Sequence, residues 1–454
     1  MKKFLSLALL LILALVVFAA CRSTDEEETT TTQVTTTTAG EQNGNGDENI
    51  TDDGVIVTGF SAHSQGVTDT TITVGNTAAT SGGFATVGVP FNAGMQAYFD
   101  IVNAAGGING RTIQFIHHDD GFDAPTGIAM TEQLIHDDRV FALVGHFGTP
   151  TVGATLPMIF ETGIPAVYFA TGIGQLFIPN AATVATGQRI FPVQPIFEPE
   201  GYVLVARAAS EYSVTTLGLI FSNDDAGQDM ARGARSQAAE LGITLVEMQV
   251  NPADLASTIP AALAMRDADV DAIIVAMNQG PFPATINALV ANGVDVPVFT
   301  SYVNADATMI EGFASDYLSA NADFPVYSTA WLDIFDPNGA EGFHADYWEF
   351  FAGISAIDDT LIANSFAMAG WIAASTFVQG LYYMGDVDFV TWEGLTEALE
   401  SNLINLPMGG AMDFSNGQRT GTTSMTLNRA DVEELEWIPI RPFALLSDII
   451  DTIN

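Results

Sequence analysis

Basic side chains are scarce in this sequence. Its 454 residues include 13 Lys and Arg against 54 Asp and Glu, which gives a formal net charge of −41 at pH 7. Both lysines, Lys2 and Lys3, stand at the extreme N-terminus, so arginines are the only permanent cations of the remaining chain. Binding of phosphates requires a basic face. We therefore exclude nucleic acids, polyphosphates and anionic membrane surfaces as partners of the folded part.

Cysteine is almost absent as well, because Cys21 is the only one. A single thiol cannot form an intrachain disulfide or supply the paired thiolates of zinc and iron–sulfur sites. H-E-x-x-H, G-x-S-x-G, Walker and G-x-G-x-x-G motifs are missing too. Two clusters of acids, at 117–123 and 333–341, only superficially resemble metal sites, because strand alternation separates the histidines of the first and the second lacks calcium-loop spacing. The sequence predicts no cofactor, no metal and no enzymatic activity.

The N-terminus has the three parts of a secretion signal: a basic start, a run at 4–20 that is apolar except for Ser6, and small residues before Cys21. Ala19 and Ala20 before Cys21 resemble the bacterial lipobox, in which the cysteine becomes the lipid-modified first residue of the mature protein. Phe18 departs from that pattern, where Leu is usual. The run is near the short limit for a helix that crosses a membrane, so an uncleaved anchor is the alternative.

These features predict a lipoprotein signal peptide at 1–20 and lipidation of Cys21. The predicted tether comprises residues 21–65, and its part from Thr24 to about Asp53 is rich in Thr and acids and has almost no large apolar side chain. Such a segment cannot bury enough surface to offset its ordering entropy, so we expect a disordered tether. The expected location is extracytoplasmic, anchored to the cell membrane as a lipoprotein, in the periplasm or at the cell surface.

From about Thr70, short β-branched segments alternate with Ala-rich helical segments. The first series predicts strands at 71–75, 112–117, 140–145 and 164–169, with helices at 89–103, 125–137 and up to about 161 between them. A second series predicts a helix at 199–211, strands at 216–221, 244–248, 272–276 and 298–300, and helices at 228–241, 255–266 and 282–292 between them. Helices at 362–380 and 392–401 and extended pieces follow. Strands separated by such helices form parallel sheets, so we expect an α/β protein with two lobes.

Six segments between Gly66 and Ile440 carry a more specific signal through their order and spacing. They are GVTDTTITVG, NAAGGINGRTIQFIHHDDGFD, VFALVGHFGTPTVGATLPMIFETGIPAVYFATG, RIFPVQPIFEPEGY, FSNDDAGQDMARGARSQAAELG and LPMGGAMDFSNGQRTG. Together they resemble the type I periplasmic solute-binding proteins, specifically the branched-chain amino-acid-binding group of ABC importers. The resemblance implies two Rossmann-like lobes with parallel sheets, joined by a three-stranded hinge and closing on a small ligand. Lobe I would comprise 66–193 plus 328–410, and lobe II 194–327 plus 411–454.

The resemblance also implies where lobe I holds the ligand. The family's carboxylate contact, a Ser or Thr after a strand, matches Thr149, which also fits the N-cap of a helix beginning at Pro150. The next loop matches at Ala170, whose carbonyl would receive a ligand ammonium, and at Thr171, whose hydroxyl would support the carboxylate. Leucine-binding members have that Thr one residue later, where this chain has Gly172.

We expect a third loop of lobe I, which contains Ser81 and Phe84, to line the same cleft. Phe84 would cover an apolar part of the ligand. The two glycines of this loop allow close approach of the backbone to a ligand, although they also fit a simple turn.

Three loops of lobe II are expected to face the same cleft and to contribute Asp225, Gln279 and Tyr302. Leucine-binding members place a Glu for the ligand ammonium in the third loop, where this chain has the neighbourhood of Tyr302. Asp225 is the alternative countercharge, although acids of this loop also fit ordinary loop positions. From the missing Glu and the aromatic Phe84, Phe282 and Tyr302, we expect an apolar or aromatic carboxylate or amide in preference to a free branched-chain amino acid.

The expected function is that of a monomeric solute-binding lipoprotein of an ABC importer. It would capture a small amino acid or other small carboxylate or amide, hand it to the permease subunits and reach the membrane through lipidated Cys21. The alternative is a sensory receptor in which the same lobes signal to a membrane partner, and the sequence does not separate the two.

Overall fold

The computed structural model describes residues 65–178, 189–336, 338–385 and 390–453. The predicted signal peptide, Cys21 and the tether lie outside these residues, apart from Gln65 at the end of the predicted tether. The Gln65 side chain donates a hydrogen bond to the Val140 carbonyl (2.9 Å). In the described part of the chain, no helix combines the length and the apolar character that a membrane span requires.

The first sheet has five parallel strands in the order β2-β1-β3-β4-β5. Its strands are β1 (Thr71–Ala78), β2 (Thr112–Asp119), β3 (Ala142–Phe147), β4 (Ala166–Ala170) and β5 (Ile190–Phe191). Helices α1 (Ala85–Ala104), α2 (Ala124–His136) and α3 (Thr149–Thr162) connect them. All six residues of β3 are buried, as expected for a parallel strand covered on both faces.

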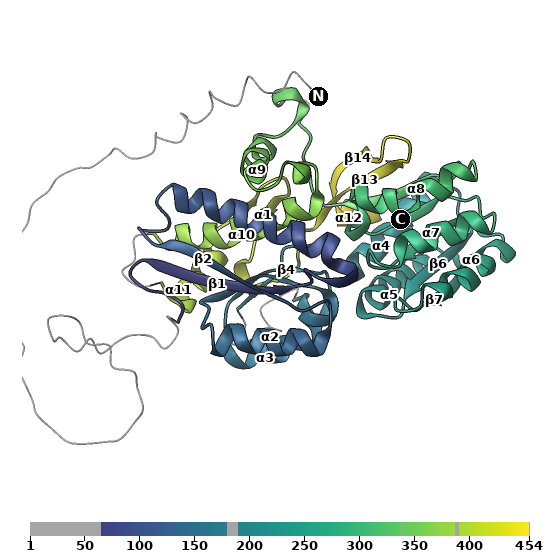
Figure 1. The fold of residues 1–454 in the computed structure, drawn as a ribbon. Coiled ribbons are helices and arrows are strands. Elements are labelled where there is room, and N and C mark those ends of the chain that lie inside the picture. Colours follow the sequence, from purple (N-terminus) through teal and green to yellow (C-terminus); the bar gives the residue numbers. More distant parts are fainter. Residues whose placement is uncertain (1–64, 179–188, 337, 386–389, 454) are drawn as a thin grey trace, which may run out of the picture. The chain divides into compact units, whose positions relative to one another are not determined.

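Later segments return to this first sheet. They are α9 (Ala345–Ser355), α10 (Ser365–Tyr383) and α11 (Trp392–Ser401), and Figure 1 shows α10 running along α1. The two helices approach closely through glycines, since a Cβ on Gly94 would lie 1.9 Å from the Ala367 carbonyl oxygen and one on Gly370 would lie 1.8 Å from that of Phe91. Only glycine allows this distance between the helix backbones.

The second sheet has seven strands in the order β14-β13-β10-β9-β8-β6-β7. Five of them are parallel: β6 (Thr216–Ser222), β7 (Thr244–Val250), β8 (Ala272–Ala276), β9 (Val298–Thr300) and β10 (Val326–Ala330). The accompanying helices are α4 (Phe197–Glu211), α5 (Asp225–Glu240), α6 (Thr258–Asp267), α7 (Phe282–Ala291), α8 (Ala307–Ser319) and α12 (Leu446–Asp451). A separate pair, β11 (Ile404–Leu406) and β12 (Gly410–Met412), is antiparallel.

The predicted α/β class with two Rossmann-like sheets is confirmed, with one correction to the prediction of parallel sheets. Strands β13 (Ser424–Asp431) and β14 (Glu436–Leu445) are antiparallel to their neighbours. The two strands are joined by only four residues, 432–435, and a connection this short permits only a hairpin. Helix bounds differ by a few residues, most clearly in α1, which begins four residues before the predicted start and contains Pro90.

Candidate ligand-binding cleft

A cavity of about 660 Å³ lies between loops of the first sheet and loops of the second, within the size range of small-molecule sites. Six of the eight residues predicted to bind ligand line it: Phe84, Thr149, Ala170, Thr171, Gln279 and Tyr302. The other two, Ser81 and Asp225, are not among its lining residues. The strand-end loops predicted from the sequence therefore do meet at one cavity.

A pair of threonine hydroxyls forms the polar centre of the cavity wall on the side of the first sheet. Thr149 Oγ1 and Thr171 Oγ1 are 2.9 Å apart, and their side chains are only 4% and 2% exposed. Thr171 Oγ1 also accepts the Ile173 N–H (3.3 Å). Only one of the two hydroxyl protons can lie between the two oxygens, so the pair retains one proton for a further acceptor.

The helix that begins at Thr149 adds backbone donors beside this pair. Pro150 has no N–H, and the Val152 N–H bonds to the Gly148 carbonyl (2.9 Å). The N–H groups of Thr149 and Thr151 therefore have no partner within the helix, and the helix dipole makes this end favourable for an anion. The prediction that Thr149 is the N-cap is wrong, since Gly148 takes that position with φ +92°, a left-handed conformation that suits glycine.

Aromatic rings surround the hydroxyl pair. Phe84 stacks on Phe122 with ring centroids 3.7 Å apart, and Phe122 meets Phe147 edge-on at 6.4 Å. Phe91, Phe197 and Trp331 also line the cavity. The expectation that Phe282 lines the cleft is wrong: its side chain is fully buried against Phe313 in the core of the second sheet. Sequence reasoning missed Phe122, which lies within the turn at 120–123 and belongs to no periodic pattern.

Tyr302 lies in the cavity wall on the side of the second sheet. Its ring stacks on Phe197 at 6.0 Å, and its hydroxyl donates to the Pro195 carbonyl (3.0 Å). Gln194, another lining residue that sequence reasoning missed, donates from its amide to the Tyr168 hydroxyl (2.9 Å). Tyr302 therefore joins the loop after β9 to the segment that runs from the first sheet to the second.

Glu200 fixes the loop that contains Tyr302 through hydrogen bonds. This fully buried carboxylate on α4 accepts the Ser301 hydroxyl (2.7 Å), the Tyr302 N–H (2.8 Å) and the Thr329 hydroxyl. Burial raises the pKa of Glu200 to about 7, although these hydrogen bonds oppose the rise. Sequence reasoning did not find this residue, because it lies within a helix and no motif marks it.

Ser81 and Asp225 have other surroundings than predicted. Ser81 is exposed, and its N–H donates to Asp119 (3.2 Å). Burial acts to raise the pKa of Asp119, but hydrogen bonds from Ser81, Thr80 and Gly121 outweigh it and lower the pKa to about 2. Asp225 is the exposed first residue of α5, lies near Gly153 of α3 and is not among the residues that line the cavity. The preceding residue, Asp224, caps α5 through the Gly227 N–H (3.0 Å).

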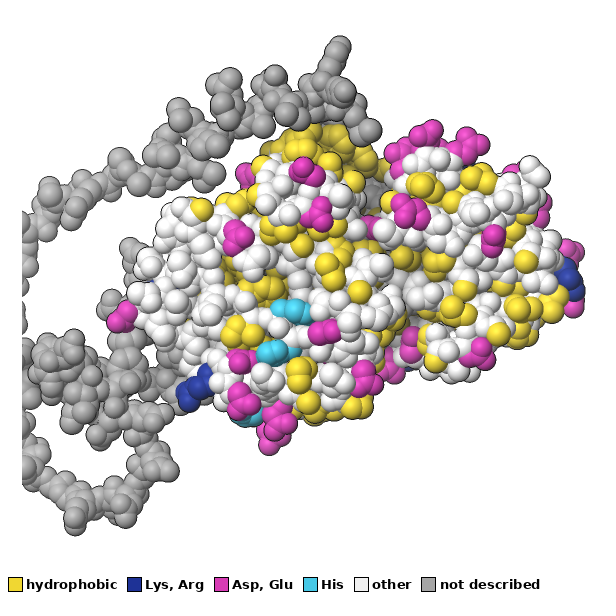
Figure 2. Space-filling model, viewed as in Figure 1, with side chains coloured by type: hydrophobic (Ala, Val, Ile, Leu, Met, Phe, Trp, Pro, Cys, Tyr) yellow, Lys and Arg dark blue, Asp and Glu magenta, His cyan; other side chains and the backbone are white. Residues whose placement is uncertain are grey.

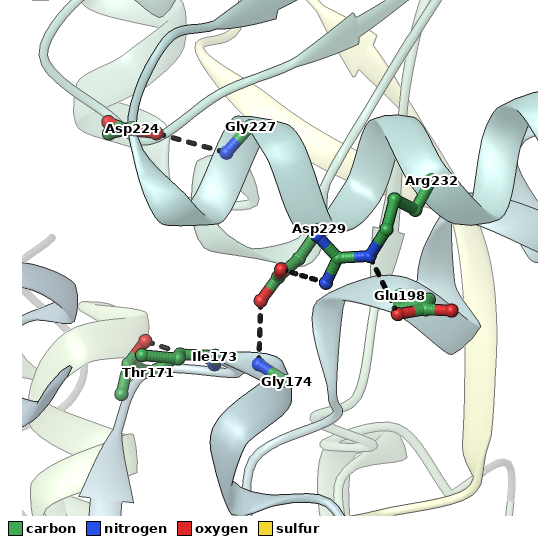
Figure 3. A network of polar contacts seen from close by, with 8 residues as sticks. All are labelled: Thr171, Ile173, Gly174, Glu198, Asp224, Gly227, Asp229 and Arg232. Atoms are coloured by element: carbon green, nitrogen blue, oxygen red, sulfur yellow. Dashed lines mark hydrogen bonds and ion pairs between the residues drawn. The ribbon is translucent and has the colours of Figure 1, made fainter. Parts of the chain in front are cut away.

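A polar network joins α5 to the loop that carries Thr171 (Figure 3). Asp229 Oδ2 accepts the Gly174 N–H at 2.6 Å, and Arg232 bonds to both Asp229 and Glu198. Gly174 follows β4 of the first sheet, whereas Asp229 and Arg232 belong to a helix that covers the second. The network therefore connects the two sides of the cleft through the loop that holds one of its two central hydroxyls.

Comparisons with known proteins agree with this architecture. A family model described as periplasmic binding protein matches residues 71–433. The chain belongs to the periplasmic binding protein family. The family resemblance expected from the six segments is thus confirmed, and the structural relatives below have the type I fold.

Proteins similar to this periplasmic binding protein are named for different ligands. An amino acid binding protein of Pseudomonas aeruginosa is 25% identical over 167 residues, which are 36% of this chain and 42% of that relative. A branched-chain amino acid ABC transporter protein of Thermus thermophilus with bound valine superposes with a TM-score of 0.72 at 16% identity, covering 86% of this chain and 100% of its own. A fatty acid ABC transporter substrate-binding protein of Thermomonospora curvata gives 0.70 at 19% identity, covering 88% and 97%.

Proposed function

We propose that this periplasmic binding protein is an extracytoplasmic receptor of an ABC importer. It captures a small carboxylate-bearing solute, such as an amino acid or another small acid or amide, between two lobes. The observation that carries the proposal is the buried Thr149–Thr171 hydroxyl pair at the N-terminus of α3, in the wall of the cavity between the two sheets. Hydroxyls and free N–H groups at a helix N-terminus stabilise a carboxylate without any Lys or Arg.

The net charge of −41 is compatible with an anionic ligand because the donors are local. Figure 2 shows acidic side chains scattered over the visible face, with few basic ones among them. The carboxylate would be removed from water and held by dipoles within hydrogen-bonding distance, whereas the surface charges are separated from it and screened by salt. The attraction for a ligand carboxylate therefore comes from the cleft and not from the net charge of the whole surface.

In this proposal the units that close are the two lobes expected from the sequence, 66–193 plus 328–410 and 194–327 plus 411–454. Closure is the whole mechanism, and no bond is made or broken. The chain is held at the membrane by lipidated Cys21, so that a closed receptor stays near its permease subunits. The similarity to ABC transporter proteins of Thermus thermophilus and Thermomonospora curvata supports the transport assignment.

The test is a thermal-shift screen of the purified chain with amino acids, aromatic acids, short fatty acids and their amides. The proposal predicts a rise in melting temperature with at least one small solute, recovery of that solute unchanged, and a smaller radius of gyration by X-ray scattering on saturation. No stabilisation by any solute, or turnover of the solute that binds, would contradict it. For the anchor, mass spectrometry of the chain extracted from membranes should find a lipid-modified Cys21 as its first residue, and a membrane-bound chain that keeps residues 1–20 with an unmodified Cys21 would contradict lipidation.

A further inference from the structure

An aromatic wall stands directly beside the predicted carboxylate anchor. The Phe84–Phe122 stack is nearly parallel, with an angle of 15° between the rings, and Phe122 reaches the anchor loop itself. A Cβ placed on Gly148 would lie 3.0 Å from the Phe122 ring, so the ring packs on the residue immediately before Thr149. On the far side, Phe84 reaches Gly280 of the second sheet, where a Cβ would lie 3.5 Å from the ring. A ligand held at Thr149 therefore meets an apolar wall next to its carboxylate.

The backbone that presents Phe122 is strained. Phe122 has φ +65°, an uncommon conformation for a bulky residue. Buried Asp120 holds it there: one carboxylate oxygen accepts the Phe122 N–H (2.8 Å), and the other accepts the Thr151 hydroxyl (3.0 Å). Asp120 thus ties the Phe122 turn to the same helix end that carries Thr149. Such strain persists where the surroundings enforce it, and it is concentrated at ligand sites.

Acidic acceptors for an ammonium group are missing from this part of the cavity. Three of the described lining residues are acids: Asp306, Asp333 and Glu436. Both oxygens of Asp306 are fully used, since one accepts the N–H and hydroxyl of Thr308 and the other the N–H and hydroxyl of Ser365. Four donors occupy the four lone-pair positions of a carboxylate.

The other two acids face water. The Asp333 side chain is 38% exposed, and Glu436 is an exposed residue of β14. In an α-amino acid the ammonium is two bonds from the carboxylate carbon, so it must be buried next to Thr149 and Thr171. There the Ala170 carbonyl, which already accepts the Gly148 N–H (3.3 Å), is the predicted acceptor. A neutral carbonyl does not compensate for removing an ammonium with three donors from water.

We propose that the cleft selects an apolar monocarboxylate that carries no ammonium group, and that Phe122 determines this specificity together with Phe84. The proposal rests on the proposed solute-binding function and names its ligand class. The carboxylate lies at Thr149 and Thr171, and the aliphatic or aromatic remainder lies on the Phe84–Phe122 wall.

The test uses two pairs of ligands that differ only in the ammonium group: 4-methylpentanoate with leucine, and 3-phenylpropanoate with phenylalanine. Titration calorimetry of the whole chain should give at least a tenfold lower Kd for the deaminated member of a pair. Equal or tighter binding of the amino acid would overturn the proposal while leaving solute binding intact. Absence of binding by all four would overturn it too, and the wider screen would then decide separately whether the chain binds any solute.

Two matched variants test the role of Phe122. Phe122→Leu should weaken 3-phenylpropanoate binding about tenfold, whereas Phe282→Leu, in the core of the second sheet, should leave the Kd unchanged and lower only the melting temperature. Equal Kd values for the wild type and Phe122→Leu would remove Phe122 from the specificity assignment. If Phe122→Leu does not fold, Phe84→Leu provides the same measurement from the other ring of the stack.

Discussion

The buried carboxylate of Glu200 makes the stability of this protein depend on pH in a specific window. Its pKa is about 7 in the folded chain, against 4.5 for a free side chain, because burial disfavours the charged form. Between these two values the folded state binds more protons than the unfolded state. Stability therefore falls as pH rises from about 4.5 to about 7, and it is independent of this group outside that window.

The size of the effect follows from the shift. One pKa unit corresponds to about 1.4 kcal/mol, so the rise to about 7 amounts to about 3 kcal/mol of lost stability above pH 7. Glu200→Gln resembles the protonated acid: its oxygen can accept the Tyr302 N–H, and its amide can donate to the Ser301 hydroxyl. The variant should match the wild type near pH 4.5 and be more stable by up to about 3 kcal/mol at pH 8.

Urea unfolding of both proteins at steps between pH 4.5 and 8.5 measures this difference. Glu198→Gln is the matched control on the same helix, because Glu198 is substantially exposed and bonds only to Arg232 across the surface. Its difference from the wild type should stay nearly constant over the window. If the Glu200→Gln curve runs parallel to that of the wild type, the carboxylate does not carry the pH dependence and the reasoning fails.

Three further substitutions probe the cleft network and the packing. Asp229→Ala removes the acceptor of the Gly174 N–H and should weaken solute binding about tenfold by calorimetry, as expected for a charge-assisted bond of about 1.5 kcal/mol. The control Asp224→Ala removes a helix cap and should lower stability by about 1 kcal/mol with unchanged affinity for the solute. Equal losses of affinity in the two variants would contradict the role of Asp229. Arg419→Lys should cost about 3 kcal/mol in urea unfolding, because this 1% exposed guanidinium donates to several carbonyls and to Glu400, whereas exposed Arg441→Lys should cost little. Gly94→Ala should destabilise by at least about 2 kcal/mol and Gly83→Ala by almost nothing, since only the first Cβ meets a backbone; similar values would refute the packing argument.

The order of elements was predictable because it depends on local signals. Alternating β-branched and Ala-rich segments specify strands and helices, and the handedness of crossovers then places strand ends at one edge of each sheet. Thr149 and Thr171 were assigned to one wall because their loops match those that hold the ligand carboxylate in the family that the six segments resemble. The antiparallel β13–β14 hairpin was missed because the C-terminal part was assigned only as extended pieces, without the four-residue connection at 432–435 that requires antiparallel pairing.

Individual side-chain directions were less predictable. Asp224 and Asp225 are adjacent at the start of α5, yet Asp224 caps the helix from an extended backbone conformation, whereas Asp225 is the exposed first helical residue and does not line the cavity. Phe282 and Phe84 both follow strands, and only packing decides which of them enters the core. Phe122 depends on a left-handed turn held by Asp120, a constraint made by two distant segments that leaves no periodic signal in the sequence.

The most direct test of the central claim measures the role of the Thr149 hydroxyl in holding a carboxylate. Titration calorimetry with the carboxylate that stabilises the wild type most should be repeated on Thr149→Val and Thr149→Ser. Loss of a hydrogen bond to a charged group costs about 1.5–3 kcal/mol, so the Val variant should bind at least tenfold more weakly, whereas the Ser variant, which keeps the hydroxyl, should bind nearly as well as the wild type. Equal affinity of all three proteins for that carboxylate would contradict the account.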